Sequence, residues 1–255
     1  MRITLLGTGT SCGVPQIGCT CPTCTSADPR DKRLRCSALV QVSGKRILID
    51  CGPDFREQML HTDFQSLDAV LITHEHYDHV GGLDDLRPYS VFGDVNVYAE
   101  PYCADHLEQR IPYCFTPPEK RYPGVPAINL HRIQPHQPIH IGEDVEIIPI
   151  RVMHGHLPIL GFRIQNFAYI TDMKSIPNTE MPYLQGIDTL VLNALRHADH
   201  PTHQTIEEAI SFSQLLGSPE TYLIHMSHHI LPHAVEDALL PPGFHLAYDF
   251  MEIEC

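Results

Sequence analysis

The sequence predicts an α/β fold. Short apolar runs rich in branched side chains indicate buried strands, and several of them end at a histidine or an aspartate. Two segments, Thr205 to Leu216 and His233 to Leu240, are expected to be helices, and strand-like runs precede and follow them. The first segment carries an apolar stripe at helical spacing, which is expected to face the core. With no linker, repeat or low-complexity segment, residues 1–255 are expected to form one domain.

The earliest strand-like runs lie in the amino-terminal part of the chain. Leu5 and Leu6 lead into a loop of small residues, Gly7–Ser11. The run Arg46–Ile49 leads to Asp50, which Cys51 and a glycine follow. Asp50 is therefore either a turn residue after a strand or a functional carboxylate at a strand end.

The segment from His74 to His79 places four metal-ligand side chains within six residues. It follows the apolar run Ala69–Thr73, and the two glycines after it allow a tight turn, so Asp78 and His79 are expected near a helix start. His74 and His76 alternate on an extended stretch and can hold one cation, whereas Asp78 and His79 can hold a second. Imidazole and carboxylate suit zinc, manganese or iron(II). A polar exposed loop is the alternative, and the dense pattern favours the metal site of a hydrolase.

Three later strand-like runs end at further candidate ligands. They are Val145–Val152 before His154, Phe167–Thr171 before Asp172, and Thr221–Ile224 before His225. Taken singly, each candidate is an ordinary structural or surface residue in a chain with 18 histidines. As a set at strand ends they complete a two-metal site, in which a carboxylate at position 172 can bridge the cations.

This arrangement resembles the metallo-β-lactamase superfamily over nearly the whole chain. The resemblance implies a four-layer αββα sandwich with two divalent metals at one edge, manganese or zinc, with iron as a further option. It implies one metal on His74, His76 and His154, a second on Asp78, His79 and His225, and Asp172 as the bridge. Asp50 matches an early aspartate of the superfamily that accepts a hydrogen bond from a ligand.

Three cysteines near the amino terminus suggest a further metal. They follow the pattern Cys-x-Cys-x-x-Cys and are Cys19, Cys21 and Cys24. Three thiolates this close can chelate one tetrahedral structural zinc but need a fourth ligand, for which His228 is the first candidate and His229 the second. Disulfides are the weaker alternative, because the nine cysteines are an odd number and no signal peptide is evident.

The small-residue loop, the cysteine cluster, the histidine-rich segment and the sequence His-Met-Ser-His together resemble the cyclic-phosphate phosphodiesterases of the carbon-phosphorus lyase pathway. The resemblance implies that His203 is a catalytic proton donor, on a loop where Arg196 is a candidate phosphate contact. A plain surface arginine is the alternative for Arg196. The residues around His203 match this family less well, so the exact substrate stays open. Proteins of pyrroloquinoline quinone synthesis share the cysteine cluster, but the complete ligand set favours the hydrolytic branch.

The expected reaction is hydrolysis of a small or cyclic phosphodiester by a metal-activated hydroxide that Asp78 and Asp172 orient. One alternative is a ribonuclease that processes the 3′ end of transfer RNA. Only seventeen residues separate His154 from Asp172, which leaves no room for the substrate-gripping arm of that family. The other alternative is a non-catalytic metal-binding scaffold. A β-lactamase is least expected, because Asp78 and a bridging Asp172 suit phosphoester hydrolysis better.

Composition limits the partners. A formal charge of −14 disfavours long nucleic acids, although bound metals can still attract a small phosphate ester. The sequence has neither a membrane-length apolar stretch nor a leader-like amino terminus, so we expect a cytoplasmic protein without membrane partners. The proline-rich stretch 111–126 cannot be regular for long, and a lid, a homodimer contact or a plain surface loop are the alternatives for it.

Overall fold

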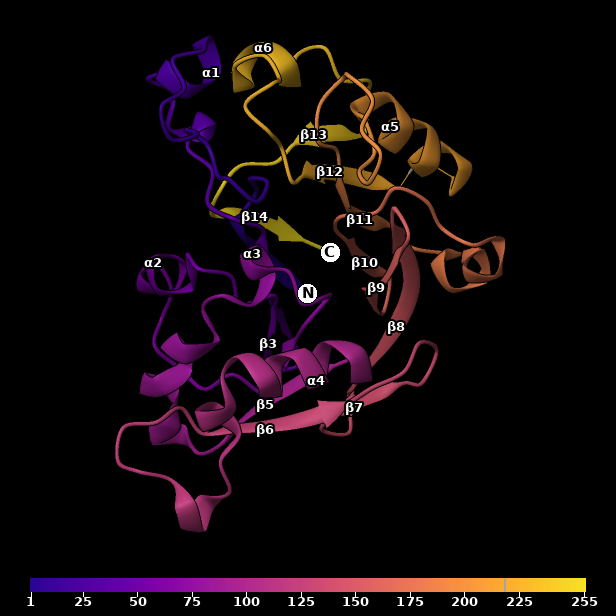
Figure 1. Ribbon diagram of the computed structural model, residues 1–255. Coiled ribbons are helices and arrows are strands. Elements are labelled where there is room, and N and C mark those ends of the chain that lie inside the picture. Colours follow the sequence, from indigo (N-terminus) through magenta and orange to yellow (C-terminus); the bar gives the residue numbers. More distant parts are fainter. Residues whose placement is uncertain (218) are drawn as a thin grey trace.

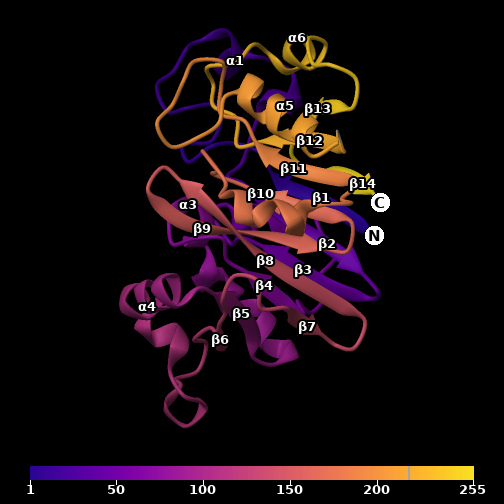
Figure 2. The same ribbon diagram turned by 90° about the vertical axis from the view of Figure 1, so that its right-hand side faces the viewer.

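In a computed structural model that describes residues 1–217 and 219–255, two seven-stranded mixed sheets stack face to face. Helices cover the outer face of each sheet (Figures 1 and 2). This confirms the four-layer αββα arrangement. Three apolar clusters separate the layers, one between the sheets and one between each sheet and its helices.

The first sheet holds most of the amino-terminal half of the chain. Its strands in spatial order are β14 (Met251–Glu254), β1 (Arg2–Gly7), β2 (Ser37–Val42), β3 (Lys45–Ile49), β4 (Ala69–Leu71), β5 (Val95–Ala99) and β6 (Ile128–Arg132). Strands β3 to β6 are parallel to one another, so their carboxyl ends lie at the same edge.

The second sheet repeats this plan with the carboxyl-terminal half. Its strands in spatial order are β13 (Phe244–Leu246), β12 (Glu220–Ile224), β11 (Thr189–Asn193), β10 (Phe167–Ile170), β9 (Leu157–Ile164), β8 (Val145–His154) and β7 (Ile139–Ile141). Strands β10 to β13 are parallel. Every strand-like run that the sequence analysis singled out therefore lies on a strand, with shifts of one to three residues at the ends.

Short helices fill the outer layers. The α-helices are α1 (Pro22–Thr25), α2 (Phe55–Leu60), α3 (Tyr77–Val80), α4 (Pro101–Arg110), α5 (Ile206–Leu215) and α6 (His233–Asp237). The 3₁₀ segments are η1 (Pro29–Asp31), η2 (Leu83–Phe92), η3 (Pro112–Phe115), η4 (Pro118–Lys120) and η5 (Asn178–Leu184).

The two predicted helices differ in how well their bounds were predicted. The helix expected from Thr205 is α5, and Thr205 caps it with a capping box to Glu208, whose side chain accepts a hydrogen bond from the Thr205 backbone N–H. The helix expected to reach Leu240 is wrong at its end, because α6 stops at Asp237. Two prolines follow Leu240, and a residue before proline is disfavoured in the helical conformation.

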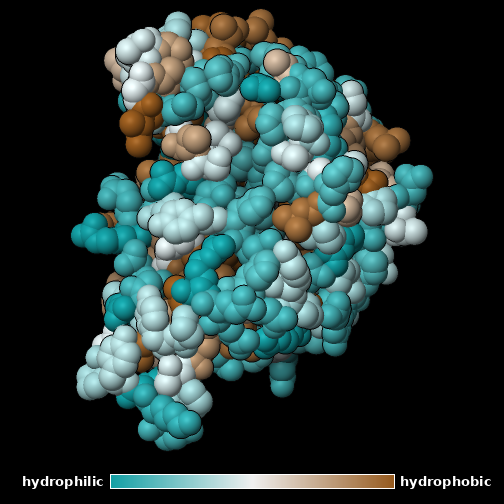
Figure 3. All heavy atoms as spheres, viewed as in Figure 1, coloured by the Kyte–Doolittle hydropathy of each residue, from teal (hydrophilic) through white to brown (hydrophobic). Residues whose placement is uncertain are grey.

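The proline-rich stretch 111–126 is irregular, as predicted, and contains only η3 and η4. Its contacts are with its own half of the molecule: the Tyr113 hydroxyl donates to Asp84, and Arg121 pairs with Asp94 at 2.7 Å. Hydrophilic side chains cover most of the face in Figure 3. Among the described residues, no helix combines the length and apolar character that crossing a bilayer requires.

Candidate functional site

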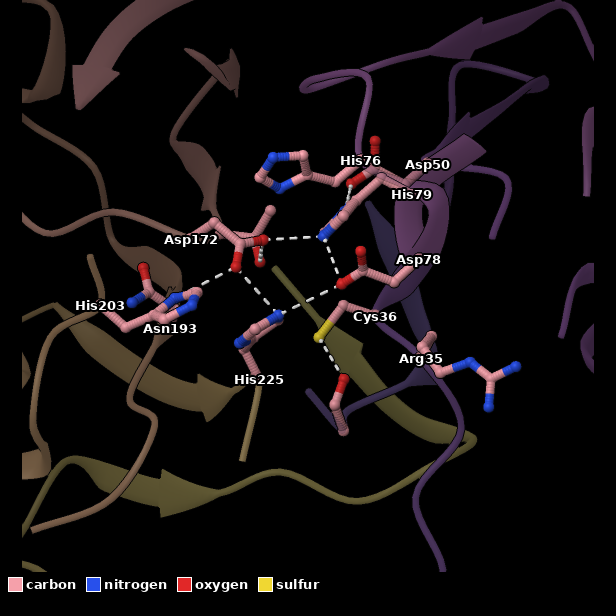
Figure 4. A network of polar contacts seen from close by, with 12 residues as sticks. Arg35, Cys36, Asp50, His76, Asp78, His79, Asp172, Asn193, His203 and His225 are labelled. Carbon is pink, nitrogen blue, oxygen red and sulfur yellow. Dashed lines mark hydrogen bonds and ion pairs between the residues drawn. The ribbon is translucent and has the colours of Figure 1, made fainter. Parts of the chain in front are cut away.

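Side chains from the carboxyl ends of strands in both sheets meet at one edge of the sandwich. Asp50 follows β3 and His74 comes three residues after β4, while Asp172 and His225 follow β10 and β12 of the other sheet. The two sheets are joined there by a hydrogen bond from the backbone N–H of Leu160 to the carbonyl of Thr73. Figure 4 shows the carboxylates and imidazoles pointing toward one another from the two sides.

Three of these positions have a left-handed backbone. The φ angles are 60° at Asp50, 55° at Asp172 and 62° at His225. Residues with a side chain rarely adopt this conformation, and it turns each of them sharply off its strand. Gly52 lets α3 pack close to the loop after Asp50, since a Cβ at position 52 would lie 2.1 Å from the carbonyl oxygen of Asp78.

The Asp172 carboxylate is the centre of the cluster. Its Oδ2 lies 2.8 Å from His79 Nε2, and its Oδ1 lies 2.9 Å from His225 Nε2. Asp78, in the first turn of α3, places Oδ2 3.2 Å from His79 Nε2 and 3.7 Å from His225 Nε2. The Asp172 carboxylate therefore lies between two sets of side chains. One set is the residues predicted for the second metal, and the other is the remaining residues of the site.

The residues predicted for the first metal lie beside this group. His74 is buried, and its Nε2 lies 3.0 Å from His76 Nδ1. The exposed ring of His76 is edge-on to His154, with centroids 5.2 Å apart. His154 donates from Nδ1 to the carbonyl of Thr202 at 2.9 Å, which leaves Nε2 free. The possible ligand atoms lie close together in two further groups. One group is His74, His79 and Asp172, and the other is His154, Asp172 and His203.

Asp50 lies behind His79. Its Oδ2 accepts a hydrogen bond of 2.7 Å from His79 Nδ1, so His79 Nε2 faces the cluster. The backbone N–H and hydroxyl of Thr73 also donate to Asp50. Thr73 Oγ1 in turn lies 3.0 Å from His74 Nδ1, which leaves Nε2 of His74 on the site side. One carboxylate thus orients two imidazoles.

The charges of the site balance one another inside the protein. Burial opposes the charged form of His225, but Asp172 and Asp78 raise its pKa to about 9. Burial likewise opposes the charged form of Asp172, yet His225 and His79 hold the pKa of its carboxyl group well below the usual range. Burial lowers the pKa of His74 well below the ordinary value. Protons on His79 and His225 therefore balance the carboxylates where no metal does.

The donor set fits divalent cations. In the part of the chain that the structure describes, the buried Nε2 of His79 and both ring nitrogens of His225 have no hydrogen-bond partner, although carboxylate oxygens lie near. Neutral imidazole nitrogens and carboxylates at this spacing are ligands for zinc, manganese or iron. The raised pKa values of His225 and His79 keep these rings protonated where no metal is bound. A cation here would replace those protons.

His203 lies on the opposite side of Asp172 from His79. Its Nδ1 is 3.2 Å from Asp172 Oδ1, and its ring stacks on His225 with centroids 4.8 Å apart. Burial, together with His225, lowers the pKa of His203 to about 3. The ring is therefore neutral near pH 7, and an added negative charge beside it would raise that pKa.

Arg196 is placed differently from the prediction of a phosphate contact. Its Nε donates to the carbonyl of Ala198 at 3.1 Å, and its Nη2 donates to the carbonyl of Asp199 at 3.0 Å. The guanidinium thus braces the loop that leads to His203. The sequence could not reveal this, because the loop conformation sets the direction of the side chain.

The cysteine cluster lies in the segment between β1 and β2. Ligand atoms of Cys19, Cys21, Cys24 and His228 lie within 4.8 Å of one another. His228 Nδ1 is 3.3 Å from the Cys19 thiol, and His229 stands outside the group. A backbone hydrogen bond from Cys24 lowers the pKa of Cys21 to about 6. All nine cysteines are free, so the four residues form a set suited to tetrahedral zinc.

Several supporting residues were missed by sequence reasoning. The Asn193 side chain accepts from the Met173 backbone N–H at 2.7 Å and donates to its carbonyl at 2.9 Å, which fixes the backbone after Asp172. Thr73 and Thr202 orient histidines as described above. A polar residue at or near a strand end was the only signal for Asn193 and Thr73, and Thr202 lies in the loop between β11 and α5, where nothing in the sequence marked it.

Comparisons with known proteins agree with this geometry. Residues 45–226 match the family model of the β-lactamase superfamily domain. The chain is 48% identical over 254 residues to an octanoyltransferase of Porphyromonas gingivalis, covering 99% of this chain and 51% of the relative. It is 34% identical over 110 residues to coenzyme PQQ synthesis protein B of Methylobacterium radiotolerans, covering 36% of this chain and 37% of that protein. The chain thus spans about half or less of the length of these curated relatives.

Among solved structures, a diphosphatase of the PhnP family has a TM-score of 0.90 and 42% identity, with 99% of this chain and 97% of that chain covered. The Zn²⁺-bound PqqB of Methylobacterium extorquens has a TM-score of 0.78 at 20% identity, with all of both chains covered. The short form of human tRNase Z has a TM-score of 0.73 at 18% identity, covering 100% of this chain and 99% of that one. The last two likenesses show the fold alone.

Proposed function

Because this chain belongs to the metallo-β-lactamase superfamily, and within it to the PhnP family, and is a metal-dependent hydrolase, we propose that it cleaves a small phosphodiester or disubstituted diphosphate. In both classes the phosphorus that is attacked carries two oxygen substituents and a single negative charge. Cyclic phosphates belong to the first class. The observation that carries the proposal is Asp172, whose two oxygens lie 2.8 to 3.2 Å from His79, His225 and His203.

We infer that two divalent metals, manganese, zinc or iron, are held as the sequence analysis predicted, with Asp172 between them. Bound there, they would polarise the phosphoryl group and lower the pKa of water from about 15.7 toward 7. The unpartnered nitrogens of His79 and His225 support this inference. Asp50 and Thr202 keep the other nitrogens of His79 and His154 engaged, so each ligand presents a fixed tautomer.

The remaining chemistry belongs to the chain itself. Asp78 and Asp172 present carboxylate oxygens that accept hydrogen bonds from the attacking water and align it with phosphorus. The leaving oxygen needs a proton, and His203 beside Asp172 is the donor.

Two other activities are less well supported. The Porphyromonas gingivalis relative is named for acyl transfer, but about half of that protein lies outside the match and is free to carry that activity. A transfer-RNA processing activity would need a long polyanion to approach a chain of charge −14. The resemblance to tRNase Z is limited to the fold.

A substrate panel tests the proposal. Purified protein loaded with manganese, zinc or iron(II) in turn should hydrolyse bis-nitrophenyl phosphate, a 2′,3′-cyclic nucleotide or a nucleoside diphosphate sugar. It should leave nitrocefin nearly untouched. It should also leave nitrophenyl phosphate nearly untouched, because Asp78 and Asp172 repel the second negative charge of a monoester. Asp172→Asn should abolish turnover. Faster hydrolysis of nitrocefin than of every phosphorus substrate would overturn the assignment.

A further inference from the structure

The loop of residues 194–205 carries His203 into the site, and His203 itself does little to hold it there. Within residues 1–217 and 219–255, His203 Nδ1 has no hydrogen-bond partner, although Asp172 lies near. The position of the ring must therefore come from the loop. Apart from backbone bonds, Lys174 pairs with Asp199 of the loop at 2.9 Å, His154 donates to the carbonyl of Thr202, and the Ser227 hydroxyl donates to the carbonyl of Leu195 at 3.0 Å.

His197 provides a further attachment, which joins the loop to two helices. Its Nδ1 lies 2.6 Å from Glu207 Oε1 in the first turn of α5. Its Nε2 lies 2.9 Å from Glu236 Oε1 in α6. Carboxylate oxygens only accept when ionised, so both ring nitrogens must donate for both bonds to exist.

Glu236 extends this attachment toward the cysteine cluster. It is fully buried, and its second oxygen accepts a hydrogen bond of 2.9 Å from the backbone N–H of Leu231. The preceding residue, Ile230, accepts a hydrogen bond of 2.7 Å from Thr23, which lies between Cys21 and Cys24 in sequence. Figures 1 and 2 both show α1 beside α6. A short chain of contacts thus runs from the cysteine cluster to the His203 loop.

We propose that His197 is a positioning residue for His203, because it clamps the 194–205 loop between α5 and α6 by donating hydrogen bonds from both ring nitrogens. This inference rests on the proposed function only in giving His203 a proton to deliver. The clamp itself is a statement about the loop, and it can be tested without any substrate.

The clamp depends on pH in a defined direction. Glu207 and Glu236 are the charged groups that face the ring from α5 and α6, while on its own loop Arg196 binds backbone carbonyls and Asp199 binds Lys174. Hydrogen bonding to Glu207 outweighs burial and raises the pKa of His197 above its ordinary value. The clamp is therefore complete below about pH 6.5 and is lost as pH rises through the raised pKa.

The first experiment compares His197→Ala with His245→Ala. His245 is also a half-exposed histidine paired with a glutamate, Glu220 at 2.8 Å, but it lies on β13 away from the loop. Hydrogen exchange of residues 196–204 should be several-fold faster in His197→Ala and unchanged in His245→Ala. Turnover of a substrate with an alkoxide leaving group should fall about 10-fold in kcat, with little change in KM or in turnover of bis-nitrophenyl phosphate.

Unchanged exchange in His197→Ala would overturn the clamp, whatever the activity. An equal loss of kcat on both substrates would also overturn it, since a general structural defect would affect both. If exchange accelerates while neither the variant nor wild type turns over any phosphorus substrate, the clamp stands and the proposed function fails.

The second experiment uses Glu236→Gln, which keeps the shape of the clamp and removes its need for charge. The amide oxygen can accept from Leu231 and the amide N–H can donate to His197 Nε2, so a neutral ring completes both bonds. In wild type, exchange of residues 196–204 should accelerate as pH rises through the His197 titration, after correction for intrinsic rates. In Glu236→Gln it should not. An NMR-measured pKa of His197 at or below about 6.5 in wild type would refute the proposal.

Discussion

The imidazoles of the site differ in the hydrogen-bond partner of the ring nitrogen that points away from the site. His79 donates to Asp50, His154 donates to the carbonyl of Thr202, and His74 contacts the Thr73 hydroxyl. Each of these contacts fixes one ring nitrogen and leaves the other for the site. Among the described residues, His203 Nδ1 and both ring nitrogens of the predicted ligand His225 have no hydrogen-bond partner, so these contacts do not by themselves distinguish a metal ligand from a proton donor.

Replacing His203 separates these roles. His203→Ala should slow hydrolysis of a phosphodiester with an alkoxide leaving group by about 10²-fold or more, because the departing oxygen loses its proton donor. A nitrophenolate leaves without help, so bis-nitrophenyl phosphate should be affected much less. Steady-state kinetics on both substrates measures the difference, and metal content should equal that of wild type. Loss of a metal would make His203 a ligand instead.

At this scale the sequence predicted which residues converge better than how they point. Histidines and aspartates at strand ends had to meet, because parallel strands end at a common edge. The choice between His228 and His229 needed the backbone, where the N–H of His229 bonds to the Ser227 hydroxyl in a turn that leaves His228 facing the thiols. The ligand assignments themselves stay predictions.

Among the secondary-structure elements, α5 bears directly on the His203 loop because it begins three residues after His203. Thr205 Oγ1 accepts a hydrogen bond of 3.1 Å from the backbone N–H of Glu208, and Glu208 also holds Lys174 at 3.0 Å. The same contacts therefore hold both the first turn of α5 and the loop before it.

Thr205→Ala should lower the free energy of unfolding by about 1 kcal/mol, since one donor of the first turn loses its acceptor. Urea denaturation followed by circular dichroism measures this. Ser211→Ala is the matched control: Ser211 is exposed in the same helix, and its change should stay within about 0.5 kcal/mol. Equal effects of the two substitutions would mean that the cap contributes no special stability.

The elements were predictable where periodicity or capping marked them. The apolar stripe of the segment from Thr205 is visible in the sequence, and the start of α5 was predicted to within a residue. The short helices α1 and α3 have four residues each and too few turns to show a period, and of the two only α3 was predicted, from the helix start expected near Asp78 and His79. They exist because the loops around Cys21 and Asp78 are held by contacts far away in sequence.

At the level of the whole molecule, the cysteine cluster joins the two ends of the fold. Cys19 and His228 are 209 residues apart in sequence and 3.3 Å apart in space. A cation bound there would link residues 209 positions apart in the sequence. Such a link acts on folding as well as on the local loop, because the unfolded chain lacks it.

We expect about three metals per chain by elemental analysis, with about one zinc left after brief chelation. Cys21→Ser should remove that zinc and lower the melting temperature strongly, since a structural zinc contributes on the order of 10 kcal/mol to folding. Cys12→Ser is the control, because Cys12 is exposed and outside the cluster. A Cys21→Ser protein with unchanged zinc and unchanged melting would rule out the site.

The left-handed backbone at Asp50, Asp172 and His225 has an evolutionary consequence. Each such residue costs on the order of 1–3 kcal/mol, whereas glycine adopts the conformation freely. While catalysis is under selection, the chemistry of these side chains outweighs the strain. In a lineage where the gene duplicates and one copy is released from catalysis, relief of this strain favours glycine at positions 172 and 225, whereas glycine at position 50 would leave the buried donors of Thr73 and His79 without their acceptor. Pseudoenzymes descended from this protein should therefore lose Asp172 and His225 before they lose Asp50, His74 or His79.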